Sequence, residues 1–136
     1  MIVQSSGNAV INATNTSVNV TGTGPSNNAI FAITYGNSTE ARVFYDAGGT
    51  AGLMSSGSNS TGIQADNRGT GDVSIDASGN ISGKVGTPNG FTFLGLDAVA
   101  GDTTGSGLGG PGNASAIYRG GTIDVQGAGA LSLIHI

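Results

Sequence analysis

Short apolar clusters spaced by polar residues run along the whole chain, and three of them alternate residue by residue. Ser17–Val20, Asp72–Ile75 and Thr122–Val125 each place β-branched residues at every second position, as in a strand with one buried face. Gly, Asn or Asp closes each cluster within a few residues. No stretch that is free of Gly and Pro is both long enough for a stable helix and apolar at helical spacing. The pattern therefore predicts an all-β protein.

A degenerate internal repeat is visible when the chain is compared with itself. Ala29–Ala32 (AIFA) resembles Gly62–Ala65 (GIQA), at an offset of about 33 positions. A further strand-like cluster follows each copy, Arg42–Tyr45 and Asp72–Ile75, at an offset of about 30 positions. Repeats of this kind are typical of solenoids, in which each unit buries its apolar residues only by stacking on its neighbours.

The predicted β-solenoid extends over residues 1–130. Ala9–Ala13 followed by Ser17–Val20 is interpreted as an earlier, shorter copy, and Gly101–Gly112 as a Gly-rich loop that protrudes from the coils. With a coil of roughly 20–30 residues, the chain would supply about five coils. Gly and Asn at the corners would supply the positive φ of tight turns. The competing architecture, a β-sandwich, needs larger core residues than this chain offers.

Composition narrows the classes of function. The 136 residues include 26 Gly, 9% are charged, and the formal net charge is −4. Four scattered cations do not form the basic surface of a nucleic-acid-binding protein. The absence of Cys excludes disulfides and thiolate metal sites, and the longest apolar run, Ala29–Ile33, is too short for a membrane-spanning helix. A disordered Gly/Ser-rich spacer is the alternative to an ordered fold, but low charge and abundant Ile and Val favour order.

Ser60–Gly83 resembles the coil repeats of bacterial autotransporter (type V secretion) passenger domains. Those repeats follow the rhythm GI-x-A, G-x-G-x-V-x-I, G-x-I-x-G, and Gly120–Gly129 resembles another coil start. The resemblance implies a right-handed parallel β-helix, export across the outer membrane and display on the cell surface. Filamentous-haemagglutinin-like exoproteins fit nearly as well. The residues that match the rhythm are Gly62, Ile63, Ala65, Gly69, Gly71, Val73, Ile75, Gly79, Ile81 and Gly83.

Two parts that the resemblance implies are not found in the sequence. Met1–Val10 has neither the basic start nor the apolar stretch of a signal peptide. The chain also lacks the many alternating strands of a C-terminal translocator barrel. We therefore expect a fragment, anchored to the outer membrane through a barrel that lies outside it.

The last six residues, Leu131–Ile136, differ abruptly from the Gly-rich chain before them. They resemble the in-frame translation of a sequencing-library transposase adaptor. The alternative is a genuine short apolar strand. We favour the adaptor, which would make 131–136 a non-native tail and would let the natural protein continue beyond Ala130.

The chain offers few groups for catalysis. Polysaccharide-cleaving β-helix enzymes mount carboxylates and cations on neighbouring coils as metal ligands or acid–base pairs, and the candidates here are Asp66, Arg68, Asp72 and Asp76. Isolated Asp residues beside Gly and Asn more often cap turns and keep a surface soluble. Without His135 no Ser-His-Asp arrangement is available. We therefore assign no catalytic, cofactor-binding or metal-binding residue.

Two Gly-rich motifs lack what their chemistry needs. Gly109–Ala116 begins like the calcium-binding repeat G-G-x-G-x-D, but Ala114 stands in place of the ligand Asp. Gly105–Gly110 matches G-x-G-x-x-G, but Pro111 and Gly112 follow it where a dinucleotide site needs a helix. The sequence predicts neither calcium nor a dinucleotide cofactor.

The N-x-[ST] sequons and the aromatic residues each have two possible roles. N-x-[ST] sequons are more frequent than composition predicts, and they are either glycan acceptors or Asn residues at corners and on outer strand faces, the interpretation that we favour. The aromatic residues are expected to be stacked internal rings, with a sugar-binding platform at Tyr35 or Tyr45 as the alternative. The sequons are at Asn12, Asn15, Asn19, Asn37, Asn59, Asn80 and Asn113.

These observations favour a structural function. The chain is expected to be an adhesin-like stalk segment of an exported bacterial surface protein, without catalysis or cofactor. Its stacked coils would contact host or surface glycans or proteins through repetitive polar loops. A piece of a polysaccharide-cleaving β-helical enzyme and a disordered spacer are the alternatives.

Overall fold

The computed structural model of the chain describes residues 1–22, 27–37, 39–57, 60–84, 94–101, 111–126 and 131–135. This described part is all-β, and it contains no helix. The all-β prediction is therefore confirmed. It follows that no helix among these residues is long and apolar enough to cross a membrane.

The described strands form three sheets in which every pairing is parallel. The first sheet has the order β1-β4-β7-β10-β13, the second β11-β8-β5-β2 and the third β12-β9-β6-β3. The strands are β1 (Ile2–Ser5), β2 (Ala9–Thr14), β3 (Val18–Val20), β4 (Ile30–Thr34), β5 (Ala41–Asp46), β6 (Leu53–Ser56), β7 (Thr61–Asn67), β8 (Val73–Ser78), β9 (Ile81–Lys84), β10 (Leu94–Val99), β11 (Ala114–Tyr118), β12 (Ile123–Gln126) and β13 (Leu131–His135).

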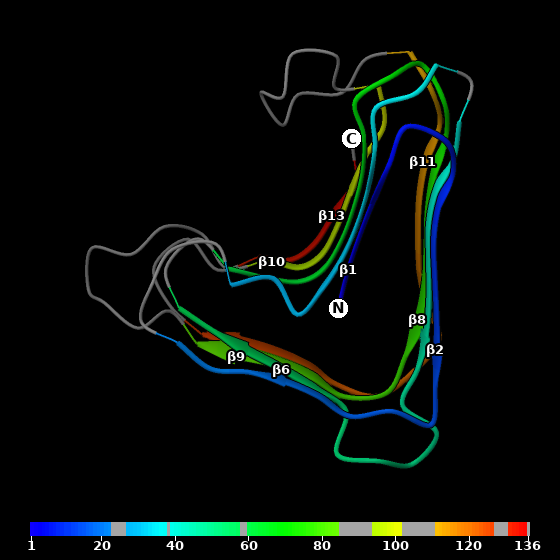
Figure 1. Cartoon of the computed structure of the whole chain (residues 1–136). Coiled ribbons are helices and arrows are strands. Elements are labelled where there is room, and N and C mark those ends of the chain that lie inside the picture. Colours follow the sequence, from blue (N-terminus) through cyan, green and yellow to red (C-terminus); the bar gives the residue numbers. More distant parts are fainter. Residues whose placement is uncertain are drawn as a thin grey trace.

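The chain visits the three sheets in turn and then returns to the first, so each circuit is one coil of a solenoid-like structure. Figure 1 shows the strands of each sheet lying over one another, with the first sheet bent midway so that its outer side lies inside the bend. Paired residues are 28 positions apart between Leu53 and Ile81, and 42 apart between Ile81 and Ile123. The expected coil length of roughly 20–30 residues therefore fits the first of these coils and is too short for the second. The described part holds four strands in the second and third sheets rather than five coils.

The register confirms one of the predicted repeats and corrects two others. Ile30 pairs with Ile63, which is the offset predicted from AIFA and GIQA. Val43 pairs with Ile75, so the offset predicted for the second pair of clusters was wrong by two positions. A shift of two preserves which side chains face inward, and so the apolar pattern alone could not detect it.

The predicted earlier copy, Ala9–Ala13 followed by Ser17–Val20, does not start at the same place in the coil as the later copies. Ala9–Ala13 lies in β2 beside β5 of the second sheet, not in the first sheet beside Ala29–Ala32. The first-sheet position is taken by β1, whose sequence IVQS bears no likeness to AIFA.

The core is built from columns of small and β-branched side chains. Inward residues of successive coils pair with one another, as Ala32, Ala65 and Ala98 do in the first sheet. Val43 and Ile75 continue the same arrangement in the second sheet and are buried. One coil alone would leave these side chains in water, so burial depends on stacking.

One inner column alternates small and large residues. Ala13, Tyr45, Ala77 and Tyr118 follow one another through β2, β5, β8 and β11. Tyr45 is fully buried and its hydroxyl donates to the carbonyl oxygen of Thr16 at 3.0 Å. The expectation of stacked rings is wrong for this pair because Ala77 separates them, and burial rules out Tyr45 as a sugar platform.

Glycine and asparagine serve two purposes at the corners. Asn15 has φ 51° and Gly79 has φ 98°, which confirms the expected positive φ of the turns. Gly69 is needed for a different reason, since a Cβ there would overlap the backbone carbonyl of Gly36 on the preceding coil. Neighbouring coils thus touch backbone to backbone at this corner.

Polar residues one or two positions before strands tie successive coils together. The side-chain oxygen of Asn8 accepts a hydrogen bond from the backbone N–H of Glu40 at 3.0 Å, just before β5. Asn28, Asp72 and Asn80 do the same for the N–H groups of Thr61, Asn113 and Thr122. These bonds occur at the entry to all three sheets and fix the register of successive coils.

The structure describes one of the two segments that the sequence analysis set apart from the coils, the C-terminal segment, and little of the other, the Gly-rich loop. Most of the predicted loop Gly101–Gly112 lies outside the described residues. Leu131–His135 forms β13 beside β10, a placement that a genuine strand would take. The adaptor origin of 131–136 stays a prediction.

Replacing Asn8 with Ala should lower the free energy of unfolding by about 0.5–1.5 kcal/mol, because the Glu40 N–H loses its acceptor. Asn12→Ala is the matched control, since Asn12 is an exposed outward residue of β2 in the same coil. Urea unfolding followed by far-UV circular dichroism measures both. Equal losses for the two variants would contradict the role given to Asn8.

Candidate functional site

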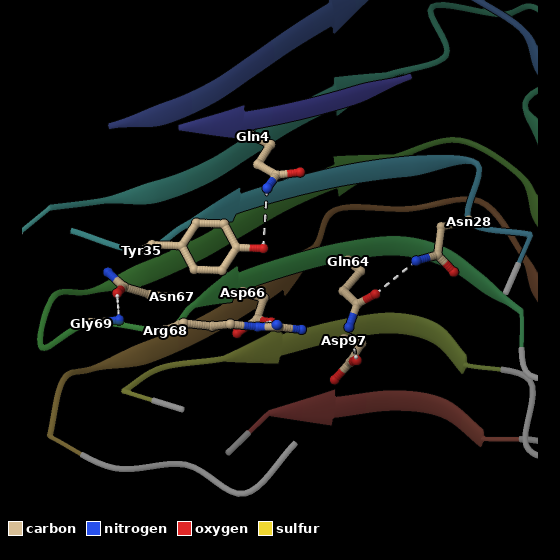
Figure 2. A network of polar contacts seen from close by, with 9 residues as sticks. All are labelled: Gln4, Asn28, Tyr35, Gln64, Asp66, Asn67, Arg68, Gly69 and Asp97. Atoms are coloured by element: carbon tan, nitrogen blue, oxygen red, sulfur yellow. Dashed lines mark hydrogen bonds and ion pairs between the residues drawn. The ribbon is translucent and has the colours of Figure 1, made fainter. Parts of the chain in front are cut away.

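The outer face of the first sheet carries a connected set of polar side-chain contacts that joins neighbouring coils. Ile63 and Ala65 of β7 belong to the core, and side chains alternate along a strand. Gln64 and Asp66 therefore face outward, and Asp97 of β10 pairs in register with Gln64. Figure 2 shows these side chains together with those of the neighbouring coils, and we call the set the outer network: Gln4, Asn28, Tyr35, Gln64, Asp66, Arg68 and Asp97.

Arg68 is the cation of the outer network. Its Nε lies 3.0 Å from Oδ2 of Asp66, and its guanidinium carbon lies 5.6 Å from the centre of the Tyr35 ring. The Tyr35 hydroxyl in turn accepts a hydrogen bond from Gln4 at 3.3 Å. An ion pair, a cation–π contact and a hydrogen bond thus connect β7 through Tyr35 to β1.

Asp97 is held by an amide rather than by a cation. The Gln64 side-chain NH₂ donates to Asp97 Oδ2 at 3.1 Å, and Asn28 donates to the Gln64 carbonyl oxygen at 2.9 Å. Burial, and next the nearby negative charge of Asp66, raise the pKa of Asp97 to about 6. Asp97 therefore retains a proton at a pH where an ordinary aspartate is ionised.

The two carboxylates face outward but are covered. Asp66 is 3% exposed and Asp97 is 6% exposed. Asp66 lies in register between Ile33 and Val99, which are buried without belonging to the inner core. A substrate has no open approach to either carboxylate, so the arrangement can hold a proton and join coils but does not present an acid–base pair to a bound glycan.

The four predicted candidates do not converge. Asp66 and Arg68 lie together, but Asp72 is at a corner, where its carboxylate accepts two hydrogen bonds from Asn113. Asp76 is on the outer face of the second sheet in a bidentate pair with Arg119, at 2.6 and 2.7 Å. Asp72 and Asp76 thus have the capping and surface roles that the sequence favoured for isolated aspartates.

Asp97 is the residue that sequence reasoning missed. The sequence does contain a signal for it. The offset that separates Ile30 from Ile63 also separates Gln64 from Asp97, so the repeat aligns these two residues on neighbouring coils. Asp97 thus falls on the outward face of β10, on the coil next to Asp66.

Of the remaining candidates, Tyr35 is 45% exposed and lies in the outer network.

Four of the sequon asparagines lie where the favoured interpretation expects them. Two face outward on strands, Asn12 on β2 and Asn19 on β3, and two form hydrogen bonds at corners, Asn80 and Asn113. Asn59 and the motif Gly105–Gly110 lie outside the described residues.

Comparison of the chain with protein-family models, with curated proteins and with solved structures gives no match. Within the described ranges, no group of three or more His, Cys, Asp or Glu residues is placed to hold a metal ion. Inference of function therefore depends on the fold and the outer network alone.

Arg68→Gln should lower the free energy of unfolding by about 1–3 kcal/mol, because the buried Asp66 loses a charge-assisted hydrogen bond. The matched control is Arg119→Gln, which breaks an ion pair whose side chains are 59% and 27% exposed and should cost less than about 1 kcal/mol. Urea denaturation of both variants checks this order. A larger loss for Arg119→Gln would contradict the greater stabilising role given to the Arg68–Asp66 pair.

Proposed function

We propose that the chain is a segment of a right-handed parallel β-helix that serves as the stalk of an exported bacterial surface protein. The observation that carries this proposal is the repeated in-register pairing of corresponding residues in all three sheets. Such coils extend by repetition, because each new coil buries its apolar side chains on the previous one. A scaffold of this kind holds other parts of a protein at a distance.

Right-handed winding is part of the proposal. Parallel strands joined by crossovers are right-handed in about 98% of β-α-β units because of the intrinsic twist of the strands. The resemblance of Ser60–Gly83 to autotransporter passenger repeats supports the same hand, together with surface location and a C-terminal translocator outside this chain.

Adhesion would use the outward-facing polar residues. Outer strand positions carry exposed Asn and Ser side chains such as Asn12, Asn19 and Ser115. Repeated weak contacts with glycans or proteins of a host or surface would add through multivalency.

The covered carboxylates support a non-enzymatic stalk over a polysaccharide-cleaving enzyme. Catalysis requires the acid and base to reach the scissile bond, and Asp66 and Asp97 are almost fully buried. The ordered columns of the core likewise support a folded segment over a disordered spacer.

A stalk should tolerate the insertion of whole coils. Duplicating residues 41–113 adds two coils and preserves the alternation of Ala and Tyr in the inner column, so the variant should keep a β-type circular dichroism spectrum and unfold at a higher urea concentration. Duplicating residues 41–72 adds one coil and places Tyr45 against its own copy, so this variant should be less stable than the two-coil variant. A random-coil spectrum of the natural chain would favour the spacer, and an unfolded two-coil variant would contradict the solenoid.

The fragment interpretation is tested at the nucleotide level. Independently prepared long reads across the codon of Ala130 should continue in frame through further coils and into a translocator. A stop codon directly after Ile136 in those reads would contradict both the adaptor origin of 131–136 and the export argument.

A further inference from the structure

We propose that Asp66 and Asp97 form a pH-sensitive latch between the coils of β7 and β10, closed while Asp97 carries a proton and loosened when both carboxylates are ionised. This inference concerns the contact between two coils and goes beyond the proposed stalk function. It does not depend on export or adhesion.

The geometry brings two acids to one face of adjacent strands. Asp97 pairs with Gln64, and Asp66 pairs with Val99, so the acids are diagonal neighbours across the β7–β10 ladder. Both are nearly covered, at 3% and 6% exposure. Charges at such positions interact more strongly than on an open surface, because water screens them less.

The partners of the two acids differ, and this decides which one holds the proton. Asp66 has the guanidinium of Arg68 at 3.0 Å, which favours its ionised form. The partner of Asp97 is the neutral side-chain NH₂ of Gln64, at 3.1 Å from Oδ2. The carbonyl oxygen of the same Gln64 amide accepts a hydrogen bond from Asn28, which orients the amide. A proton shared between two buried acids therefore resides on Asp97.

The titratable and charged groups on the two strands beside β10 are few. β10 lies between β7 and β13. On β7 the charged groups are Asp66 and, just beyond the strand, its partner Arg68. On β13 the residue in register with Asp97 is Ile134, which does not titrate. The titratable residue of β13 is His135, which is in register with Ala98, a residue of the inner core.

The sign of the pH dependence follows from linkage. The folded chain raises the pKa of Asp97 from its ordinary 3.8 to about 6, so the closed contact binds the proton more tightly than the open one. Stability from this group is fully present below about pH 4 and is lost as the pH rises through about 6. The shift corresponds to a roughly 100-fold increase in the equilibrium constant for opening.

Hydrogen exchange of the full chain between pH 4 and pH 8 tests the latch. Peptides that cover β7 and β10 are followed by mass spectrometry, and each rate is divided by the intrinsic exchange rate at the same pH. In the natural chain the protection of β10 should fall by roughly 100-fold between pH 4 and pH 7. Asp97→Asn should abolish this dependence, whereas the control Asp124→Asn, at an exposed outward position of β12, should retain it.

A direct titration keeps the proposal falsifiable even where a variant does not fold. The side-chain carboxyl carbon of Asp97, followed by NMR in the natural chain, should titrate near pH 6. In Asp66→Asn it should titrate at a lower pH, because the neighbouring negative charge is gone. An ordinary aspartate midpoint in the natural chain, or an unchanged pH dependence of exchange in Asp97→Asn, would overturn the latch.

Discussion

The hydrogen bond between corresponding residues of successive coils is the interaction on which the rest of the structure depends. It is made by the backbone within the sheets and extended at their entries by the side-chain oxygens of Asn8, Asn28, Asp72 and Asn80. Because every strand is aligned in this way, side chains of one kind form columns. The chain can then build a continuous core from Ala, Val and Ile although no coil has a core of its own.

The same alignment produces both the interior and the outer network. Residues on the inner side of β7 join apolar columns, and Gln64 on its outer side hydrogen bonds with Asn28 before it and with Asp97 of the following coil. The outer side of the first sheet lies inside its bend (Figure 1), and on this face Asp66 and Asp97 are nearly covered while Tyr35 stays 45% exposed. The inner Ala, Val and Ile side chains are similar enough to pack in more than one alignment of the strands. The polar contacts favour one alignment, because their hydrogen bonds form only between particular residues.

Sequence patterns predicted the all-β class, the stacked repeats and the offset that aligns Ile30 with Ile63, because alternation and repetition are visible in one dimension. They missed the true offset of β5 and β8, since a shift by two residues leaves the alternation unchanged. They also grouped Asp66 with Asp72 and Asp76, which are close in sequence but lie on different sides of the coil. The acid that lies diagonally opposite Asp66 on the next coil is Asp97, and it is found by applying the Ile30–Ile63 offset to Gln64.

The unequal length of the coils has a consequence for how such a protein can change. Strand pairing stays in register while the separation of paired residues varies from 28 to 42, so the extra residues lie between the described strands in the sequence. Growth of the chain at these junctions leaves the hydrogen-bonded ladders untouched. The architecture can therefore acquire new surface segments one junction at a time without a compensating change elsewhere, and its inward positions need not vary when its exterior does.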